Sequence, residues 1–138
     1  MKISARVENS EGQHKVSLGT NENTHSISIP PKPSGFGSSA NGGELLFLAL
    51  ATCYCNDIYR EAAKRGLKVE RVEVDVEGDF ESEGGPASNV TYRARVAARA
   101  SEDEIRDLMQ YTDRVAEIQN SLRYEIPVSL KGIEAIPV

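Results

Sequence analysis

The chain has 138 residues and a formal net charge of −5, with 39% hydrophobic and 27% charged residues. This composition is typical of a folded globular protein and argues against a disordered chain. The negative charge, without any run of Lys or Arg, argues against nucleic acid or an anionic membrane surface as a partner. A chain of this length is expected to form one domain over residues 1–138.

Three N-terminal stretches, residues 2–8, 13–19 and 24–29, alternate apolar and polar side chains and are separated by turn-forming residues. This alternation predicts three strands in an antiparallel meander. The first residues lack the apolar core of a secretion signal, and no apolar run is long enough to span a bilayer. We therefore expect a cytoplasmic protein whose cysteines are thiols at rest.

A loop rich in Pro, Gly and Ser occupies residues 30–43 and leads into a helix of about residues 44–65, with Gly66 as its C-terminal stop. A loop of this length is often functional, although a plain connector is an equally good interpretation. The loop lacks the Gly-Lys-Ser/Thr ending of a phosphate-binding loop, so a nucleotide is not expected.

The predicted helix carries both cysteines of the protein, Cys53 and Cys55. Residues two apart in a helix point roughly 160° away from each other, so these thiols cannot form a disulfide while the helix stays wound. Cys55 shares its face with Ile58 and Ala62, which predicts a core residue. No metal site or other cofactor is expected, because the two histidines lie in the N-terminal segment, away from both cysteines.

Cys53 lies where its helix face changes from apolar to polar, because Asp57 and Arg60 follow it on that face. Such a boundary suits a reactive thiol, although a single cysteine on a helix is also commonly structural. Arg60 lies about 10 Å further along the helix axis, which is too far for direct contact with the sulfur. Any activating cation is therefore expected from another segment or another subunit.

Residues Val69–Phe80 and Val90–Ala98 alternate apolar and polar side chains, with one phase slip near Arg71. They predict two long strands joined as a hairpin. Ser101 and Glu104 have the spacing of a capping box, which predicts the start of a second helix.

The last third of the chain predicts a break in that helix near Thr112 and Asp113, followed by a shorter helix through Leu122. Residues Ile126–Ile136 predict a last strand on an existing sheet. The complete order is α+β with mostly antiparallel pairing. The long helix has more apolar surface than one small sheet can cover, which favours a homodimer.

The sequence resembles the family of osmotically inducible protein C and organic hydroperoxide resistance proteins (OsmC/Ohr). The resemblance rests on Gly35–Cys53, on Val74–Asp79 and on Ile118–Leu122, and it extends over nearly the whole chain. It implies an OsmC-like fold with antiparallel sheets, a long central helix that carries the cysteine, and an intertwined homodimer with active sites at its interface.

The resemblance also implies roles for particular positions. Cys53 matches the peroxidatic cysteine that attacks a hydroperoxide, whereas the position of the resolving cysteine holds Ala116. The assisting glutamate and arginine of the family correspond to Gly43 and Gln13. Glu44, one residue after Gly43, is retained as a candidate catalytic residue, with a first-turn acid that favours the helix dipole as its alternative.

The first functional hypothesis is a thiol-dependent peroxidase that reduces organic hydroperoxides, with Cys53 as nucleophile and an external thiol as reductant. The alternative is a non-catalytic family member that binds a hydrophobic small molecule at the dimer interface. A third hypothesis keeps Cys53 as nucleophile in another thiol reaction, such as the detoxification of an electrophile.

Overall fold

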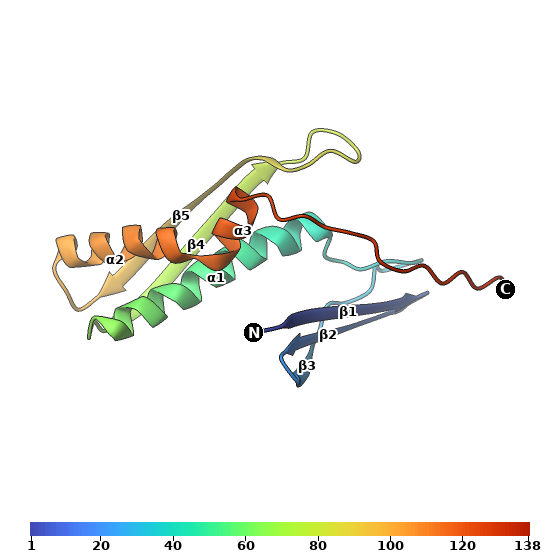
Figure 1. The fold of residues 1–138 in the computed structure, drawn as a ribbon, viewed down its shortest axis with the longest axis horizontal. Coiled ribbons are helices and arrows are strands. Elements are labelled where there is room, and N and C mark those ends of the chain that lie inside the picture. The colour runs from blue at the N-terminus through green and yellow to red at the C-terminus, as the bar shows by residue number, and fades with distance from the viewer. The chain divides into compact units, whose positions relative to one another are not determined.

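The computed structural model of the protein describes residues 1–138 and contains two compact units, Met1–Leu46 and Phe47–Val138 (Figure 1). Each unit is described by itself below. The helix α1 (Gly42–Lys64) begins in the first unit and continues into the second. A single domain over the whole chain stays a prediction.

The first unit contains a three-stranded antiparallel sheet, in the order β1 (Ile3–Ser10), β2 (Gln13–Thr20) and β3 (Asn23–Ile27). Short turns join the strands, because Ser10 pairs with Gln13, and Thr20 pairs with Asn23. These turns use positive φ angles, 70° at Gly12 and 54° at Asn21, which Gly and Asn adopt most readily. The predicted meander is thereby confirmed.

The helix α1 begins and ends at residues that are typical of helix boundaries. At its start, the side-chain oxygen of Asn41 accepts the backbone N–H of Glu44 (2.8 Å), and Glu44 accepts the backbone N–H of Asn41 (2.9 Å). At its end, Gly66 has φ +66°, and Leu67 N–H donates to the Ala62 carbonyl. Neither α1 nor any other helix combines the length and the apolar character that crossing a membrane requires.

The second unit contains a long antiparallel hairpin of β4 (Val69–Asp79) and β5 (Ser88–Ala98). Its register shifts between Val69 and Arg71, at the predicted phase slip, and again between Glu77 and Asp79. The hairpin packs its apolar face on the buried side chains Tyr54, Ile58, Ala62 and Leu108. The rings of Tyr54 and Tyr92 meet edge to face with centroids 5.0 Å apart.

The helices α2 (Glu102–Val115) and α3 (Glu117–Arg123) follow the hairpin. The capping box of Ser101 and Glu104 is present as predicted. The predicted break near Thr112 is wrong, because the helix continues to Val115 and breaks at Ala116, whose ψ is 112°. Thr112 is fully buried and donates its hydroxyl to the Leu108 carbonyl, so the residue is accommodated within the helix.

The predicted last strand at Ile126–Ile136 is wrong, since this segment forms neither strand nor helix. A strand requires a partner in a hydrogen-bonded ladder, and no strand of this chain pairs with the segment. Its apolar side chains are exposed, Val128 to 92% and Leu130 to 82%. The pattern of a half-buried strand is therefore present without the surface that would bury it.

We expect Leu108→Ala to destabilise the second unit by about 2–5 kcal/mol, because it leaves a cavity at a fully buried side chain. Urea unfolding followed by circular dichroism measures this loss. The matched control is Gln110→Ala, an exposed position on the same helix that should leave the unfolding midpoint nearly unchanged. Equal midpoints for the two variants would contradict the packing of α2.

Candidate functional site

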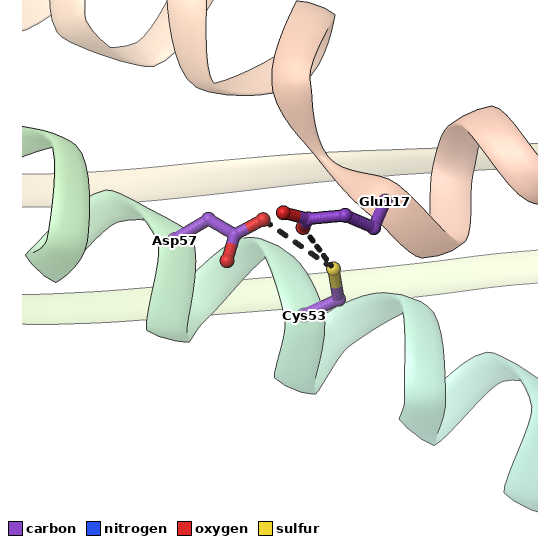
Figure 2. A group of neighbouring side chains, drawn as sticks. All are labelled: Cys53, Asp57 and Glu117. Atoms are coloured by element: carbon purple, nitrogen blue, oxygen red, sulfur yellow. Dashed lines mark hydrogen bonds between the residues drawn. The ribbon is translucent and has the colours of Figure 1, made fainter. Parts of the chain in front are cut away.

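The thiol of Cys53 lies between two carboxylates, one from its own helix and one from α3 (Figure 2). Its sulfur is 3.4 Å from Oδ2 of Asp57 and 3.8 Å from Oε2 of Glu117. Cys53 itself is half-buried. The thiol proton can thus be donated to either carboxylate, although to only one of them at a time.

Local structure explains how the two carboxylates reach the sulfur. Asp57 follows Cys53 by one helical turn, so both side chains project from the same face of α1. Glu117 is the first residue of α3, directly after the break at Ala116. Gln119 fastens this short helix to α1, because its Nε2 donates to the Leu50 carbonyl across 2.9 Å. This contact keeps Glu117 beside the thiol.

Arg60 binds both carboxylates through the oxygens that are not hydrogen-bonded to the sulfur. Its Nη1 lies 3.1 Å from Oδ1 of Asp57 and 2.8 Å from Oε1 of Glu117, and its Nε donates to Glu61. Arg60 therefore contacts both hydrogen-bond partners of the Cys53 thiol. The guanidinium fixes the orientation of both carboxylates.

Side-chain contacts tie the end of α2 to the hairpin, to α1 and to the end of α3. The Tyr92 hydroxyl donates to Asp113, and Arg123 forms an ion pair with the same carboxylate at 2.6 Å. The Tyr54 hydroxyl donates to the Met109 carbonyl (2.8 Å). Because Asp113 precedes the helix break at Ala116 and Arg123 ends α3, their ion pair links the two helices across the break.

The thiol sits in a negative environment that disfavours its ionisation. Burial raises the pKa of Cys53; the backbone N–H of Ile118 lowers it, and the charges of Asp57 and Glu117 raise it further. Burial also raises the pKa of Asp57, to about 6, with a further contribution from Glu117. Cys53 is thus a protonated thiol at rest, with a carboxyl group beside it that can carry a proton near neutral pH.

Glu117 behaves differently from Asp57. Burial opposes its ionisation, but hydrogen bonds with its own backbone N–H, with Asp57 and with Arg60 hold its pKa below the ordinary value. Its side chain is 62% exposed, whereas that of Asp57 is 9% exposed. Glu117 is therefore the carboxylate that stays charged next to the thiol.

Glu44 lies in the capping box at the start of α1, where it accepts the backbone N–H of Asn41. This contact fits the structural interpretation of Glu44, an acid in the first turn that stabilises the start of the helix. Its catalytic role stays a prediction. The cluster at Cys53 instead draws its second carboxylate from Glu117, a residue that no local sequence signal marks.

The other positions implied by the family resemblance hold side chains without acid or thiol chemistry. Ala116 is fully buried at the break between α2 and α3. Gly43 lies in the first turn of α1, and Gln13 begins β2. None of these residues can supply a resolving thiol, an acid or a cation.

The interpretation of Cys55 as a core residue is wrong. Cys55 is half-buried and lines an open cavity of about 260 Å³ with neighbours that include Asn56 and Val74. The buried face of α1 is centred on Tyr54 and Ile58, which shifts Cys55 to the edge of the packed stripe. The two thiols are free, as their opposed directions predict.

We expect Glu117→Gln to lower the pKa of the Cys53 thiol, because it removes a negative charge beside the sulfur and releases Arg60. The pH dependence of Cys53 alkylation by iodoacetamide, followed by mass spectrometry in the presence of a chelator, measures this change. Glu83→Gln, an exposed glutamate in the hairpin loop, is the control. An unchanged alkylation profile in Glu117→Gln would show that Glu117 has no influence on the thiol.

The family model for OsmC-like proteins matches residues 35–131, a segment that contains the whole Cys53 cluster. No curated protein matches the chain. An OsmC-like protein from Mycoplasma pneumoniae has 16% identity and a TM-score of 0.60, with 88% of this chain and 86% of that chain covered. An OsmC-like protein of unknown function from Vibrio cholerae has 18% identity and a TM-score of 0.59, with coverages of 88% and 93%.

An organic hydroperoxide resistance protein, OsmC, from Legionella pneumophila has 15% identity and a TM-score of 0.56, with 89% of this chain and 90% of that chain covered. At such identities the likeness establishes the fold alone. The predicted OsmC-like fold, α+β with antiparallel sheets, is confirmed, and so is the family resemblance.

Proposed function

Because the chain belongs to the OsmC-like family, we propose that it is a thiol-dependent peroxidase that reduces organic hydroperoxides, with Cys53 as the nucleophile. The observation that carries the proposal is the Cys53 sulfur placed beside two carboxylates that Arg60 orients. The fold is similar to that of a Legionella pneumophila protein described as an organic hydroperoxide resistance protein.

The cluster contains the groups that the first chemical step requires. A carboxylate of Asp57 or Glu117 takes the proton of the Cys53 thiol, and the sulfur attacks the terminal oxygen of the hydroperoxide. A sulfur–oxygen bond forms as the peroxide bond breaks, and the leaving alkoxide takes the proton from the carboxyl group. The products are an alcohol and a sulfenic acid on Cys53, which keeps the hydrogen of the hydroperoxide.

The reductant in this proposal is an external thiol. Ala116 occupies the position where the family resemblance implies a resolving cysteine, and Cys55 projects from another face of α1. An external thiol attacks the sulfenic acid to give a mixed disulfide and water, and a second thiol releases the Cys53 thiol together with an external disulfide. This cycle needs a reducing compartment, so we place the protein in the cytoplasm.

A second candidate is a non-catalytic family member that binds a hydrophobic small molecule at a dimer interface. The raised pKa of the Cys53 thiol favours it, because the thiolate is the nucleophilic form. Ala116 and Gly43 also favour the non-catalytic candidate, because neither residue has acid or thiol chemistry. Turnover of a hydroperoxide separates the two candidates.

We expect the protein to consume cumene hydroperoxide in the presence of dithiothreitol, and Cys53→Ser to reduce this rate to that of a protein-free blank. Cys55→Ser is the matched control and should keep a rate close to that of the original protein. Peroxide loss is followed in a stopped-flow assay, and the sulfenic acid is trapped on Cys53 for mass spectrometry. A blank rate for the intact protein would instead support the non-catalytic candidate.

The homodimer is part of the same proposal, and the exposed apolar side chains support it. The C-terminal segment exposes Leu130 and Ile133 to more than 80%, and the outer strand β1 exposes Ile3 and Val7. Both the segment and the edge of β1 can accept a further strand. A second copy of the chain would cover these exposed apolar surfaces.

We expect the full chain to sediment as a dimer, and the double variant Leu130→Ser, Ile133→Ser to shift toward the monomer, since it removes apolar area from the proposed interface. The matched control, Lys131→Ser with Glu134→Ser, changes two polar residues of the same segment and should remain dimeric. Sedimentation velocity over a range of concentrations provides the measurement. A monomeric full chain at all concentrations would refute the dimer.

A further inference from the structure

Three potential metal ligands converge at the Cys53 cluster (Figure 2). The sulfur of Cys53 and a carboxylate oxygen from each of Asp57 and Glu117 lie within 4.8 Å of one another. In a tetrahedral zinc site, with zinc–sulfur and zinc–oxygen bonds of about 2.3 and 2.1 Å, sulfur and oxygen ligands are about 3.6 Å apart. The observed sulfur–oxygen separations of 3.4 and 3.8 Å lie on either side of this value.

The orientation of the carboxylates fits the same arrangement. Arg60 binds Oδ1 of Asp57 and Oε1 of Glu117, and this leaves Oδ2 and Oε2 directed at the sulfur. Hydrogen bonds to the outer oxygens of ligating carboxylates are a regular feature of protein metal sites, because they fix the direction of the inner oxygens. The cluster therefore has both an inner donor set and an outer support.

The charge of the cluster matches a divalent cation. A thiolate and two carboxylates carry three negative charges, of which Arg60 neutralises one, so a divalent ion at the sulfur would balance the remainder. The exposed side of Glu117 leaves a path by which an ion can enter from solvent. A thiolate ligand favours a thiophilic metal such as zinc over magnesium or calcium.

The helix that carries Glu117 also holds a buried side-chain oxygen without a hydrogen-bond partner. Gln119 is 97% buried, since only 3% of it is exposed, and its Oε1 has no hydrogen-bond partner. Its Nε2 is bound to the carbonyl of Leu50, one turn before Cys53 on the same face of α1. A buried carbonyl oxygen without a partner is energetically costly, and this one belongs to a residue two positions after Glu117.

We propose that Cys53, Asp57 and Glu117 bind a thiophilic divalent cation, with zinc as the expected metal. Binding replaces the thiol proton by a metal–sulfur bond and releases that proton to solvent. The regulatory part of the inference rests on the proposed peroxidase function: a metal on the sulfur blocks the attack on a hydroperoxide, so zinc inhibits the enzyme reversibly. The binding part does not depend on turnover.

Cobalt is the spectroscopic probe for this site. The reduced full-length protein, freed of metal by a chelator and kept without oxygen, is titrated with cobalt, and the thiolate-to-cobalt charge-transfer absorption is recorded. We expect this band in the original protein, its loss in Cys53→Ser, and cobalt binding weakened by about tenfold or more in Glu117→Gln. Glu117 is largely exposed, so this substitution should not prevent folding, which circular dichroism checks.

Two matched controls, Cys55→Ser and Glu83→Gln, should bind cobalt as the original protein does. Addition of zinc should displace cobalt and remove the band. The proposal is overturned if the original protein gives no band at millimolar cobalt, if Glu117→Gln binds cobalt unchanged, or if the band depends on Cys55.

The inhibitory role is tested separately, with cumene hydroperoxide and a reductant that does not bind zinc. We expect zinc to slow peroxide consumption and a chelator to restore it. An unaffected rate at zinc concentrations that displace cobalt overturns the regulation. A cobalt band without any peroxidase activity supports the metal site, while the proposed function fails. Peroxidase activity without a cobalt band supports the proposed function and overturns the metal site.

Discussion

The position of α3 against α1 is the constraint on which the candidate site depends. The chain breaks at the buried Ala116, and Gln119 then donates its side-chain N–H to the carbonyl of Leu50. This contact places Glu117 at the sulfur of Cys53, where α1 alone would offer only one carboxylate, from Asp57. A buried amide hydrogen bond to a backbone carbonyl is costly to break, because both groups would lose their partner without gaining water.

The negative environment of the thiol has two chemical consequences. It keeps the proton on the sulfur at rest, because the thiolate would lie beside the charged Glu117 in a partly desolvated site. It also supplies proton acceptors for the sulfur and oxygen ligands for a cation. Arg60 makes both uses possible, since it neutralises part of the charge while it leaves the inner carboxylate oxygens facing the sulfur.

Local signals predicted most of the fold because they act between residues that are close in the chain. The strand alternation, the capping box at Ser101 and the helix stop at Gly66 all depend on neighbours within about one or two turns. The break predicted near Thr112 failed because the side chain bonds to its own helix and is buried by packing. The strand predicted at residues 126–136 failed because alternation describes a side-chain pattern and provides no partner strand.

The sequence by itself determined that Cys53 and Cys55 point in different directions and that Asp57 shares the face of Cys53, since both follow from the period of an α-helix. It also determined the family, through motifs that lie within the matched segment. Only the tertiary structure decided that Cys55 lies at the edge of the buried stripe and that Glu117 completes the cluster. These facts depend on which helix faces are covered and on how α3 packs against α1. Contacts between residues so distant in the chain leave no periodic signal in the sequence.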